Sequence, residues 1–271
     1  MKLKYRPEID GLRAIAVIAV ILYHSRVNFN GLELFKGGFI GVDIFFVISG
    51  YLITSIILKE LIYTDKINLK NFYKRRIRRI LPALLTVIMV SIPFAWIVMG
   101  SRNFIEYSES ILYSLGFTSN FYFHYEGQEY GATSGIYKPF LHTWSLSVEE
   151  QFYILFPVSL ILFFKYLKKY ILHLIILFLI LSLLLATWAN INYSLFNFYL
   201  LPTRGWELLA GVLLAYLEKF NFNLKKTKFK NYFPKIGVFL IFFSFYFFND
   251  KTLHPSLITL MPVVGCFLII A

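Results

Sequence analysis

The chain has very few of the residues that build disulfide frameworks or metal centres. Among its 271 residues there is one cysteine, Cys266, which excludes an internal disulfide framework and a cysteine-based metal site. The five histidines, at positions 24, 124, 142, 173 and 254, do not have the spacing of zinc ligands, so we expect no metal. The G-x-S-x-G turn of α/β-hydrolases is also absent, which argues against a Ser–His–Asp hydrolase.

Charged residues are also scarce. They make up 15% of the chain, against 58% hydrophobic and 20% aromatic residues, and the mean hydropathy is +0.64. This composition is too apolar for a soluble domain. We therefore predict an all-α, polytopic membrane protein in which residues 1–271 form one transmembrane domain without a soluble domain.

The positions of the basic residues predict how the chain crosses the membrane. The net charge of +12 could indicate nucleic-acid binding, but the lysines and arginines fall in alternate connections between hydrophobic segments. This is the positive-inside pattern. It predicts a cytoplasmic-membrane protein with a cytoplasmic N-terminus, in contact with membrane lipids and without a nucleic-acid partner. The densest basic run, from Lys59 to Arg79, is expected in the cytoplasm.

About eight hydrophobic segments are predicted to span the membrane, and Pro82 is expected in the first turn of the third. Residues 104–123 also have membrane length, but a span there would place two later basic stretches outside. Residues 101–146 are therefore expected to form an interfacial or re-entrant excursion on the outer side. Because the last segment is apolar to its final residue, we expect a C-terminally truncated chain. The predicted spans are residues 12–27, 38–58, 80–100, 148–164, 171–189, 199–217, 236–248 and 257–271.

Arg13 and His24 lie inside the first hydrophobic segment. Eleven residues make about three helical turns, so the two side chains would share one face, about 16 Å apart along the axis. Arginine is a fixed cation, whereas histidine titrates near neutral pH. Ionisable groups in a span usually line a cavity or substrate path, which makes this pair a functional candidate. The alternative is that Arg13 reaches the cytoplasmic interface and His24 lies among lipid headgroups.

Asp43 is the single formal charge in the second segment. Glycines at positions 37, 38, 41 and 50 would let helices approach closely around it. A buried carboxylate could orient His24, the usual arrangement for a general base. The alternative is a structural carboxylate that pairs with an arginine such as Arg13 or Arg204.

Four arginines, Arg75, Arg76, Arg78 and Arg79, lie at a predicted helix start. Residues three and four apart share a helix face, so two or three guanidinium groups can converge on one anion. The rigid fork of guanidinium donors suits phosphate. The alternative is ordinary anchoring to lipid phosphates.

The segment HTWSLSVEEQFY opens a later span. Ser147 and Glu150 have the spacing of a capping box, which would explain Glu150. Glu149 would lie one turn into an apolar helix and is the better candidate for an inward-facing polar role, such as binding an acceptor hydroxyl. Arg204 and Glu207 are expected to form an intrahelical ion pair that makes both tolerable in the membrane.

Five ordered stretches together resemble acyltransferase family 3, membrane proteins that O-acetylate bacterial surface polysaccharides. The resemblance implies about ten spans, of which about eight would be present here. It also implies transfer of an acetyl or other acyl group from cytoplasmic acyl-coenzyme A to a glycan hydroxyl on the outer side. Members with the HTWSLSVEEQFY form often continue into an extracytoplasmic hydrolase-like domain. The five stretches are RPEIDGLRAIAVIAVILYH, GGFIGVDIFFVISGYLIT, RRIRRILPA, HTWSLSVEEQFY and TRGWELLAG.

The resemblance also implies which residues bind the donor, acetyl-coenzyme A. The family's Arg-x10-His motif falls on Arg13 and His24. Its Arg-x-x-Arg motif falls either on Arg75 with Arg78 or on Arg76 with Arg79. Coenzyme A phosphates would bind these cytoplasmic arginines, and the pantetheine arm would pass Arg13 toward His24.

The implied chemistry centres on His24. Held by Asp43, His24 would act as general base on the acceptor hydroxyl or would itself carry the acyl group, with Glu149 as a further catalytic candidate. The acceptor would be a glycan such as O-antigen, another surface polysaccharide or peptidoglycan. An inactive fragment or a non-catalytic membrane partner remains an alternative. A transporter fits less well because we find no inverted repeat.

Overall fold

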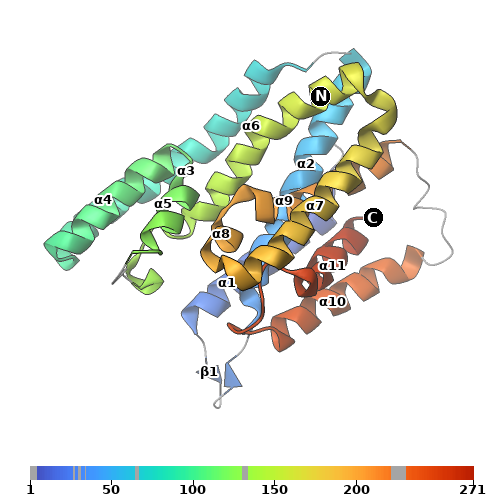
Figure 1. The fold of residues 1–271 in the computed structure, drawn as a ribbon. Helices are drawn as coiled ribbons and strands as arrows, with labels where there is room; N and C mark the ends of the chain where they lie inside the picture. Colours follow the sequence, from blue (N-terminus) through green and yellow to red (C-terminus); the bar gives the residue numbers. More distant parts are fainter. Residues whose placement is uncertain are drawn as a thin grey trace.

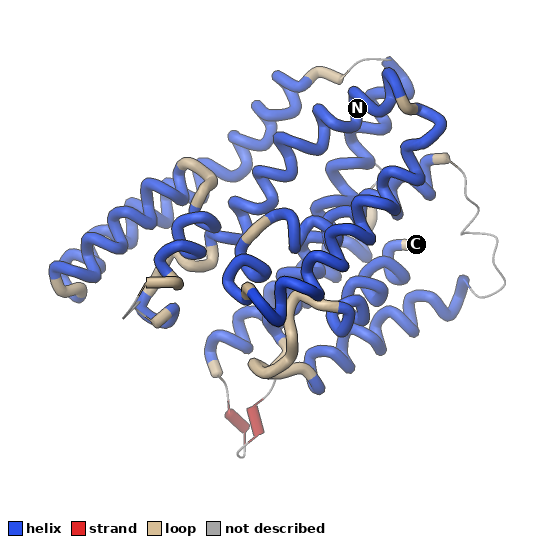
Figure 2. Tube along the Cα trace, viewed as in Figure 1, coloured by secondary structure: helices blue, strands red, loops and turns tan. Residues whose placement is uncertain are grey.

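The computed structural model describes residues 5–26, 28–29, 32–33, 35–64, 67–129, 134–220 and 230–271. Within these residues the chain is helical, apart from one antiparallel hairpin in which Asn28–Phe29 (β1) pairs with Leu32–Glu33 (β2). Figure 1 and Figure 2 show the helices as an elongated bundle. The predicted all-α class is confirmed.

The helices follow one another with short connections. Short 3-10 turns precede or join several of them. In chain order the elements are α1 (Pro7–Ser25), η1 (Gly38–Ile40), α2 (Gly41–Thr64), α3 (Leu69–Val98), α4 (Ser101–Leu115), α5 (Ser119–Glu126), η2 (Gly135–Tyr137), α6 (Thr143–Tyr166), η3 (Lys168–Tyr170), α7 (Ile171–Asn192), α8 (Ser194–Tyr199), α9 (Leu201–Lys219), η5 (Lys230–Tyr232), α10 (Phe233–Phe247), η6 (Leu257–Thr259) and α11 (Leu260–Ile270).

Four of the described helical segments are long and apolar enough to cross a membrane: Gly38–Thr64, Leu69–Val98, Thr143–Tyr166 and Lys168–Asn192. Helices α10 and α11 are apolar but shorter. Helices α1 and α9 carry buried or half-buried charges that lower their hydropathy. The predicted count of eight spans is therefore not confirmed and stays a prediction.

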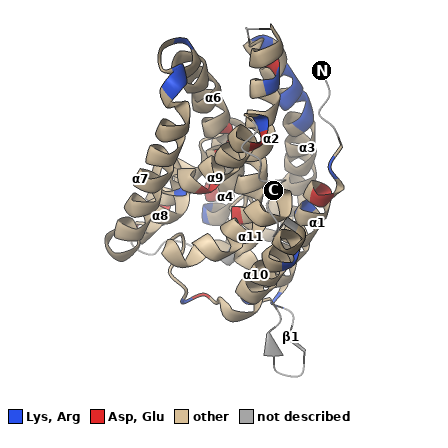
Figure 3. Cartoon of the chain, turned by 90° about the vertical axis from the view of Figure 1, so that its right-hand side faces the viewer, with Lys and Arg blue, Asp and Glu red and all other residues tan. Residues whose placement is uncertain are grey.

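Lysines and arginines gather at one end of the bundle, where α2 leads to α3, α6 leads to α7 and α9 ends (Figure 3). We call this the basic end. The opposite end, here called the far end, holds the end of α1, the start of α2, the start of α6 and the connection 249–256 between α10 and η6. The lysines at the basic end include Lys59, Lys165, Lys168, Lys169 and Lys219.

Helix α3 begins eleven residues before the predicted third span. Asn68 caps it, because its side-chain oxygen accepts from the backbone N–H of Asn71 at 3.0 Å. Pro82 is therefore inside the helix, and its prediction in the first turn was wrong. Hydropathy marks only the apolar part of this helix, whereas its lysines and arginines are good helix formers that extend it beyond the span.

The excursion predicted over residues 101–146 does not contain one continuous membrane-length helix. Helix α4 ends at Leu115, Phe117 adopts a left-handed backbone with φ 53°, and α5 begins at Ser119. The break keeps both helices short. This arrangement agrees with the predicted excursion, although its side of the membrane stays a prediction.

Helices α2 and α9 form the centre of the bundle. One hydrophobic cluster packs Val47 of α2 with Trp206 of α9, and a second packs Phe46 with Leu208. The pair can approach closely because it meets at glycines. A Cβ at Gly50 would lie 1.9 Å from the carbonyl oxygen of Leu208, and one at Gly211 would lie 2.0 Å from that of Val47. The close approach predicted for positions 37, 38, 41 and 50 is confirmed.

We expect Gly211→Ala to separate α2 from α9 and to lower the free energy of unfolding by about 1–3 kcal/mol, the usual cost of an overpacked core. Gly11→Ala is the matched control, because an added Cβ at this helical position meets nothing within 4 Å. Alanine there should be neutral or slightly stabilising. Thermal unfolding in detergent compares the two variants; equal melting temperatures would contradict the close contact.

Candidate functional site

An ion-pair cluster lies buried between α2 and α9, near the far end. Arg204 donates through Nη2 to Asp43 Oδ1 at 3.1 Å and through Nη1 to Glu207 Oε1 at 3.0 Å. All three side chains are 0% exposed. The predicted pair of Arg204 with Glu207 is confirmed. Arg204 is also the arginine that neutralises Asp43, one of the two partners considered from the sequence.

The imidazole that contacts Asp43 belongs to His254. His254 Nε2 lies 2.9 Å from Asp43 Oδ1 and 3.1 Å from Oδ2, and it is also 3.1 Å from Arg204 Nη1. The prediction that Asp43 holds His24 was therefore wrong. His254 lies 211 residues away in the connection 249–256, and no periodic pattern relates it to Asp43.

Aromatic rings enclose the guanidinium of Arg204. Its Cζ lies 5.2 Å from the ring centroid of Phe46, 5.3 Å from that of Trp144 and 5.8 Å from that of Phe198. These distances are within the range of cation–π attraction. The three rings come from α2, α6 and α8, so the charge of Arg204 connects four helices.

Asp43, Glu207 and His254 also have the residue types of a metal site. One ligand atom from each lies within 4.8 Å of the others. However, Arg204 contacts all three residues and already supplies positive charge between them. The donor set is therefore better described as an ion-pair cluster than as a metal centre.

Glu149 anchors a second polar cluster. It accepts a hydrogen bond from Ser49 Oγ at Oε1 and one from the Tyr153 hydroxyl at Oε2, both at 3.0 Å. The Arg76 Cζ lies 4.3 Å from the ring centroid of Tyr153. Arg76 and Arg13 are both near enough to act electrostatically on the Glu149 carboxylate. The structure thus brings together Arg13, Arg76 and Glu149, three residues selected from the sequence.

The predicted capping box of Ser147 and Glu150 was wrong. Helix α6 begins at Thr143, so Ser147 lies inside it rather than at its N-cap. The Ser147 hydroxyl instead lies 2.8 Å from that of Ser119 at the start of α5. Glu150 is buried, and its Oε1 has no hydrogen-bond partner among the described residues. The residue before the helix, His142, makes no side-chain cap hydrogen bond, so no capping pattern in the sequence marks this helix start.

The arginines of α3 are not equivalent. Arg76 is half-buried against α6, with its guanidinium also 5.8 Å from the ring of Phe72. Arg75, Arg78 and Arg79 are exposed. Of the two alternatives for the Arg-x-x-Arg motif, the pair that includes Arg76 is the one in contact with the Glu149 cluster.

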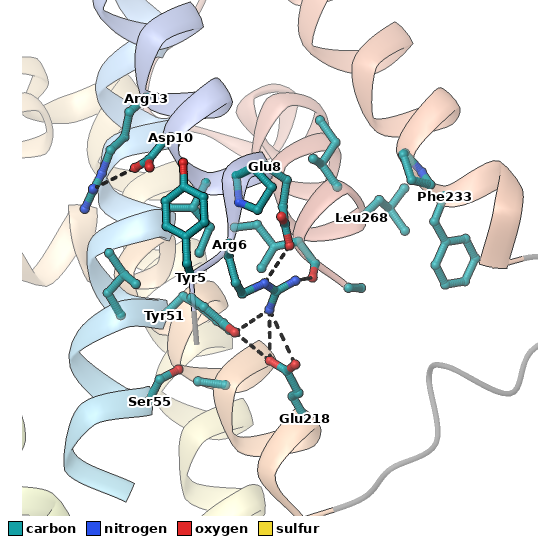
Figure 4. A pocket seen from close by; sticks show the side chains of 18 of the residues that line it. Tyr5, Arg6, Glu8, Asp10, Arg13, Tyr51, Ser55, Glu218, Phe233 and Leu268 are labelled. Atoms are coloured by element: carbon teal, nitrogen blue, oxygen red, sulfur yellow. Dashed lines mark hydrogen bonds and ion pairs between the residues drawn. The ribbon is translucent and has the colours of Figure 1, made fainter. Parts of the chain in front are cut away.

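A cavity of about 850 Å³ opens at the basic end (Figure 4). Arg13 lies on its wall, 3.5 Å from Asp10. Arg6 reaches across it, donating to Glu8 at 2.6 Å and to Glu218 at 3.2 Å. The polar groups of this cavity come from α1, α2, α9 and the two residues before α1, Tyr5 and Arg6. Arg13 therefore lies between the cavity and the Glu149 cluster.

His24 lies at the far end, in the last turn of α1, and its side chain is exposed. Its ring meets the edge of Tyr23 at a centroid distance of 5.0 Å. Ring contacts continue from Tyr23 to Phe39 at 5.6 Å and from Phe39 to His254 at 4.9 Å. His24 is thus connected to the ion-pair cluster through aromatic rings and not through Asp43.

Helical membrane bundles with buried charges and a cavity at one end include both enzymes and transporters, and the comparisons with known proteins separate these classes. The family model for the acyltransferase domain, acyltransferase family 3, matches residues 6–271. The chain belongs to this family and is a membrane protein. No solved structure matches it.

Relatives of known name are O-acetyltransferases. The chain is 40% identical over 225 residues to peptidoglycan O-acetyltransferase OatA of Listeria monocytogenes. This alignment covers 80% of the chain and 35% of the relative. It is 41% identical over 155 residues to O-acetyltransferase OatA of Staphylococcus aureus. This alignment covers 57% of the chain and 24% of the relative. The chain therefore spans about a third of the length of the Listeria protein.

We expect Asp43→Ala to lower the free energy of unfolding by about 3–5 kcal/mol, because it removes one partner of a buried ion pair and leaves Arg204 undercompensated. Arg102→Ala is the comparison: Arg102 pairs with Glu106 at 3.2 Å but is 73% exposed. Its loss should cost at most about 1 kcal/mol. Chemical unfolding in detergent measures both, and similar costs would contradict the importance of the buried cluster.

Proposed function

We propose that this chain is the membrane part of an O-acetyltransferase that moves an acyl group, acetyl in the first instance, from acyl-coenzyme A to a hydroxyl of an extracytoplasmic glycan. The observation that carries the proposal is the position of Arg13. It lines the cavity at the basic end, acts on Glu149, and lies on the same helix as His24 at the far end. Family membership supports the acyl-transfer chemistry.

The basic end would face the cytoplasm of a bacterium and receive the donor. The positive-inside pattern supports this orientation in the cytoplasmic membrane. Arg76 and Arg79 are three residues apart and would bind coenzyme A phosphates, with Arg75 and Arg78 adding positive charge around them. The pantetheine arm would enter past Arg13 and extend along α1.

Helix α1 would guide the thioester to His24. The eleven residues from Arg13 correspond to about 16 Å along the axis. As general base, His24 would take the proton from the acceptor hydroxyl while its oxygen attacks the thioester carbonyl, and the proton would then pass to the departing thiolate. As acyl carrier, the neutral His24 imidazole would attack the thioester carbonyl and release coenzyme A thiol, which takes up the ring proton. The acceptor hydroxyl would then attack the acyl-imidazole, form the ester and return its proton to the released imidazole.

Glu149 would support this route from the side of α6. Its carboxylate is held by Ser49 and Tyr153 and lies within electrostatic range of two arginines, so it would favour positions of Arg13 and Arg76 near the donor. A second role, accepting a hydrogen bond from the acceptor, remains part of the proposal. Asp43 would act at a distance, by holding α2, α9 and the connection 249–256 together.

The acceptor would be a cell-envelope glycan. The name of the Listeria relative specifies peptidoglycan, which makes peptidoglycan the first acceptor to test, before O-antigen or other surface polysaccharides.

We expect His24→Ala to reduce acetyl transfer by about 10²–10⁴-fold, the usual contribution of one positioned base, while leaving the fold intact because the side chain is exposed. Release of coenzyme A thiol from acetyl-coenzyme A, in the presence of peptidoglycan fragments, measures the rate. His173→Ala, an exposed histidine at the start of α7, is the control. Undiminished transfer by the His24 variant would contradict the proposed role.

Arg76→Ala should weaken acetyl-coenzyme A binding by about tenfold or more, because it removes a charge-assisted contact to phosphate together with the cation that faces Glu149. Arg75→Ala is the matched control from the same helix turn and should change affinity by no more than about threefold, as expected for an exposed charge. Titration calorimetry on the purified chain gives both affinities. Equal losses would instead indicate a diffuse electrostatic effect.

A further inference from the structure

His142 has a fixed side chain at the entrance to α6. It occupies the position directly before the helix, and its Nδ1 lies 2.9 Å from the carbonyl oxygen of Pro139. A carbonyl oxygen only accepts hydrogen bonds, so Nδ1 carries the proton and donates. In neutral imidazole this leaves Nε2 with a lone pair that can accept a hydrogen bond.

The backbone around His142 is also held in place. The Thr143 hydroxyl lies 2.7 Å from the carbonyl oxygen of Phe140 and 2.9 Å from the Ser119 hydroxyl. The His142 ring stacks on Phe140 with a centroid distance of 6.2 Å and an interplanar angle of 24°. His142 is nevertheless exposed. It therefore presents a preoriented acceptor atom to molecules arriving at the far end.

His142 and His24 lie at the same end of the bundle, His142 directly before α6 and His24 in the last turn of α1. Trp144, two residues after His142, contacts Phe198 at 4.7 Å, and Phe198 contacts His254 at 6.0 Å. These rings join the series of ring contacts that leads from His254 to His24. The packed residues around His142 desolvate its imidazole although the residue keeps exposed surface, and this desolvation is the main effect that lowers its pKa. The hydrogen bond to Pro139 raises the pKa, and a charge on His24 lowers it further. The imidazole is thus favoured in its neutral, accepting form.

We propose that His142 is an acceptor-binding residue whose Nε2 accepts a hydrogen bond from a hydroxyl of the glycan and holds that glycan beside His24. The proposal rests on the proposed acyl transfer and adds a residue on the acceptor side, where the donor arginines do not reach. A glycan offers many hydroxyl groups as hydrogen-bond donors. A neutral imidazole nitrogen can accept from a hydroxyl whether the glycan itself is charged or uncharged.

The test compares His142→Leu, which removes the acceptor atom, with His142→Gln, whose side-chain oxygen can accept a hydrogen bond at similar reach. The purified chain in detergent is given acetyl-coenzyme A and the soluble tetramer of β-1,4-linked N-acetylglucosamine. Acetylated tetramer and free coenzyme A thiol are both measured, which separates transfer from hydrolysis of the thioester by water. His173→Leu is the control.

We expect His142→Leu to raise KM for the tetramer by roughly three- to tenfold, the loss of one neutral hydrogen bond, with KM for acetyl-coenzyme A and thioester hydrolysis unchanged. His142→Gln should recover most of the acceptor affinity. Equal KM values for the tetramer in wild type and the leucine variant would overturn the proposal while leaving acyl transfer intact. Equal loss of transfer and hydrolysis in both His142 variants would indicate a structural role and would also overturn it. A wild-type chain that transfers nothing would reject the proposed function itself.

Discussion

The rest of the structure depends on one buried charge, the guanidinium of Arg204. A charge in the membrane interior is costly, and it is tolerated here because two carboxylates pair with it and three aromatic rings surround it. These partners come from α2, α6, α8 and α9, while His254 adds the connection before α11. Removing one member of the cluster would leave unmatched charge at the point where these segments meet, so their relative positions are determined together.

This arrangement separates support from chemistry. The side chains of Asp43, Arg204 and Glu207 are buried and pair with one another, so in the proposed transfer this cluster would act by positioning α2 and α9. The groups available to substrates lie on either side of it. Arg13, Arg76 and Glu149 lie on the side toward the basic end, whereas His24 and His142 are exposed at the far end. A donor and an acceptor could therefore approach from opposite sides, which is the arrangement a transmembrane acyl transfer requires.

Local sequence patterns predicted the local part of this structure. The i, i+3 spacing of Arg204 and Glu207 and the close approach at Gly50 follow from helix geometry and residue size. The partner of Asp43 did not follow, because His254 reaches it only through the tertiary fold. The Ser147 capping box failed because α6 starts a turn earlier. Hydropathy does not settle the number of spans, because helices such as α1 and α9 carry charged residues that lower their mean hydropathy. That Arg76 and not Arg75 contacts Tyr153 likewise depends on which helix packs beside α3.

The most direct test of the account is whether acyl transfer crosses the membrane. The chain would be reconstituted into sealed lipid vesicles that enclose the N-acetylglucosamine tetramer, with acetyl-coenzyme A added only outside. The account predicts acetylated tetramer inside the vesicles while the coenzyme A nucleotide stays outside. Acetylation only when donor and acceptor share the same compartment would contradict it, because the donor and acceptor sites would then lie at one end of the bundle.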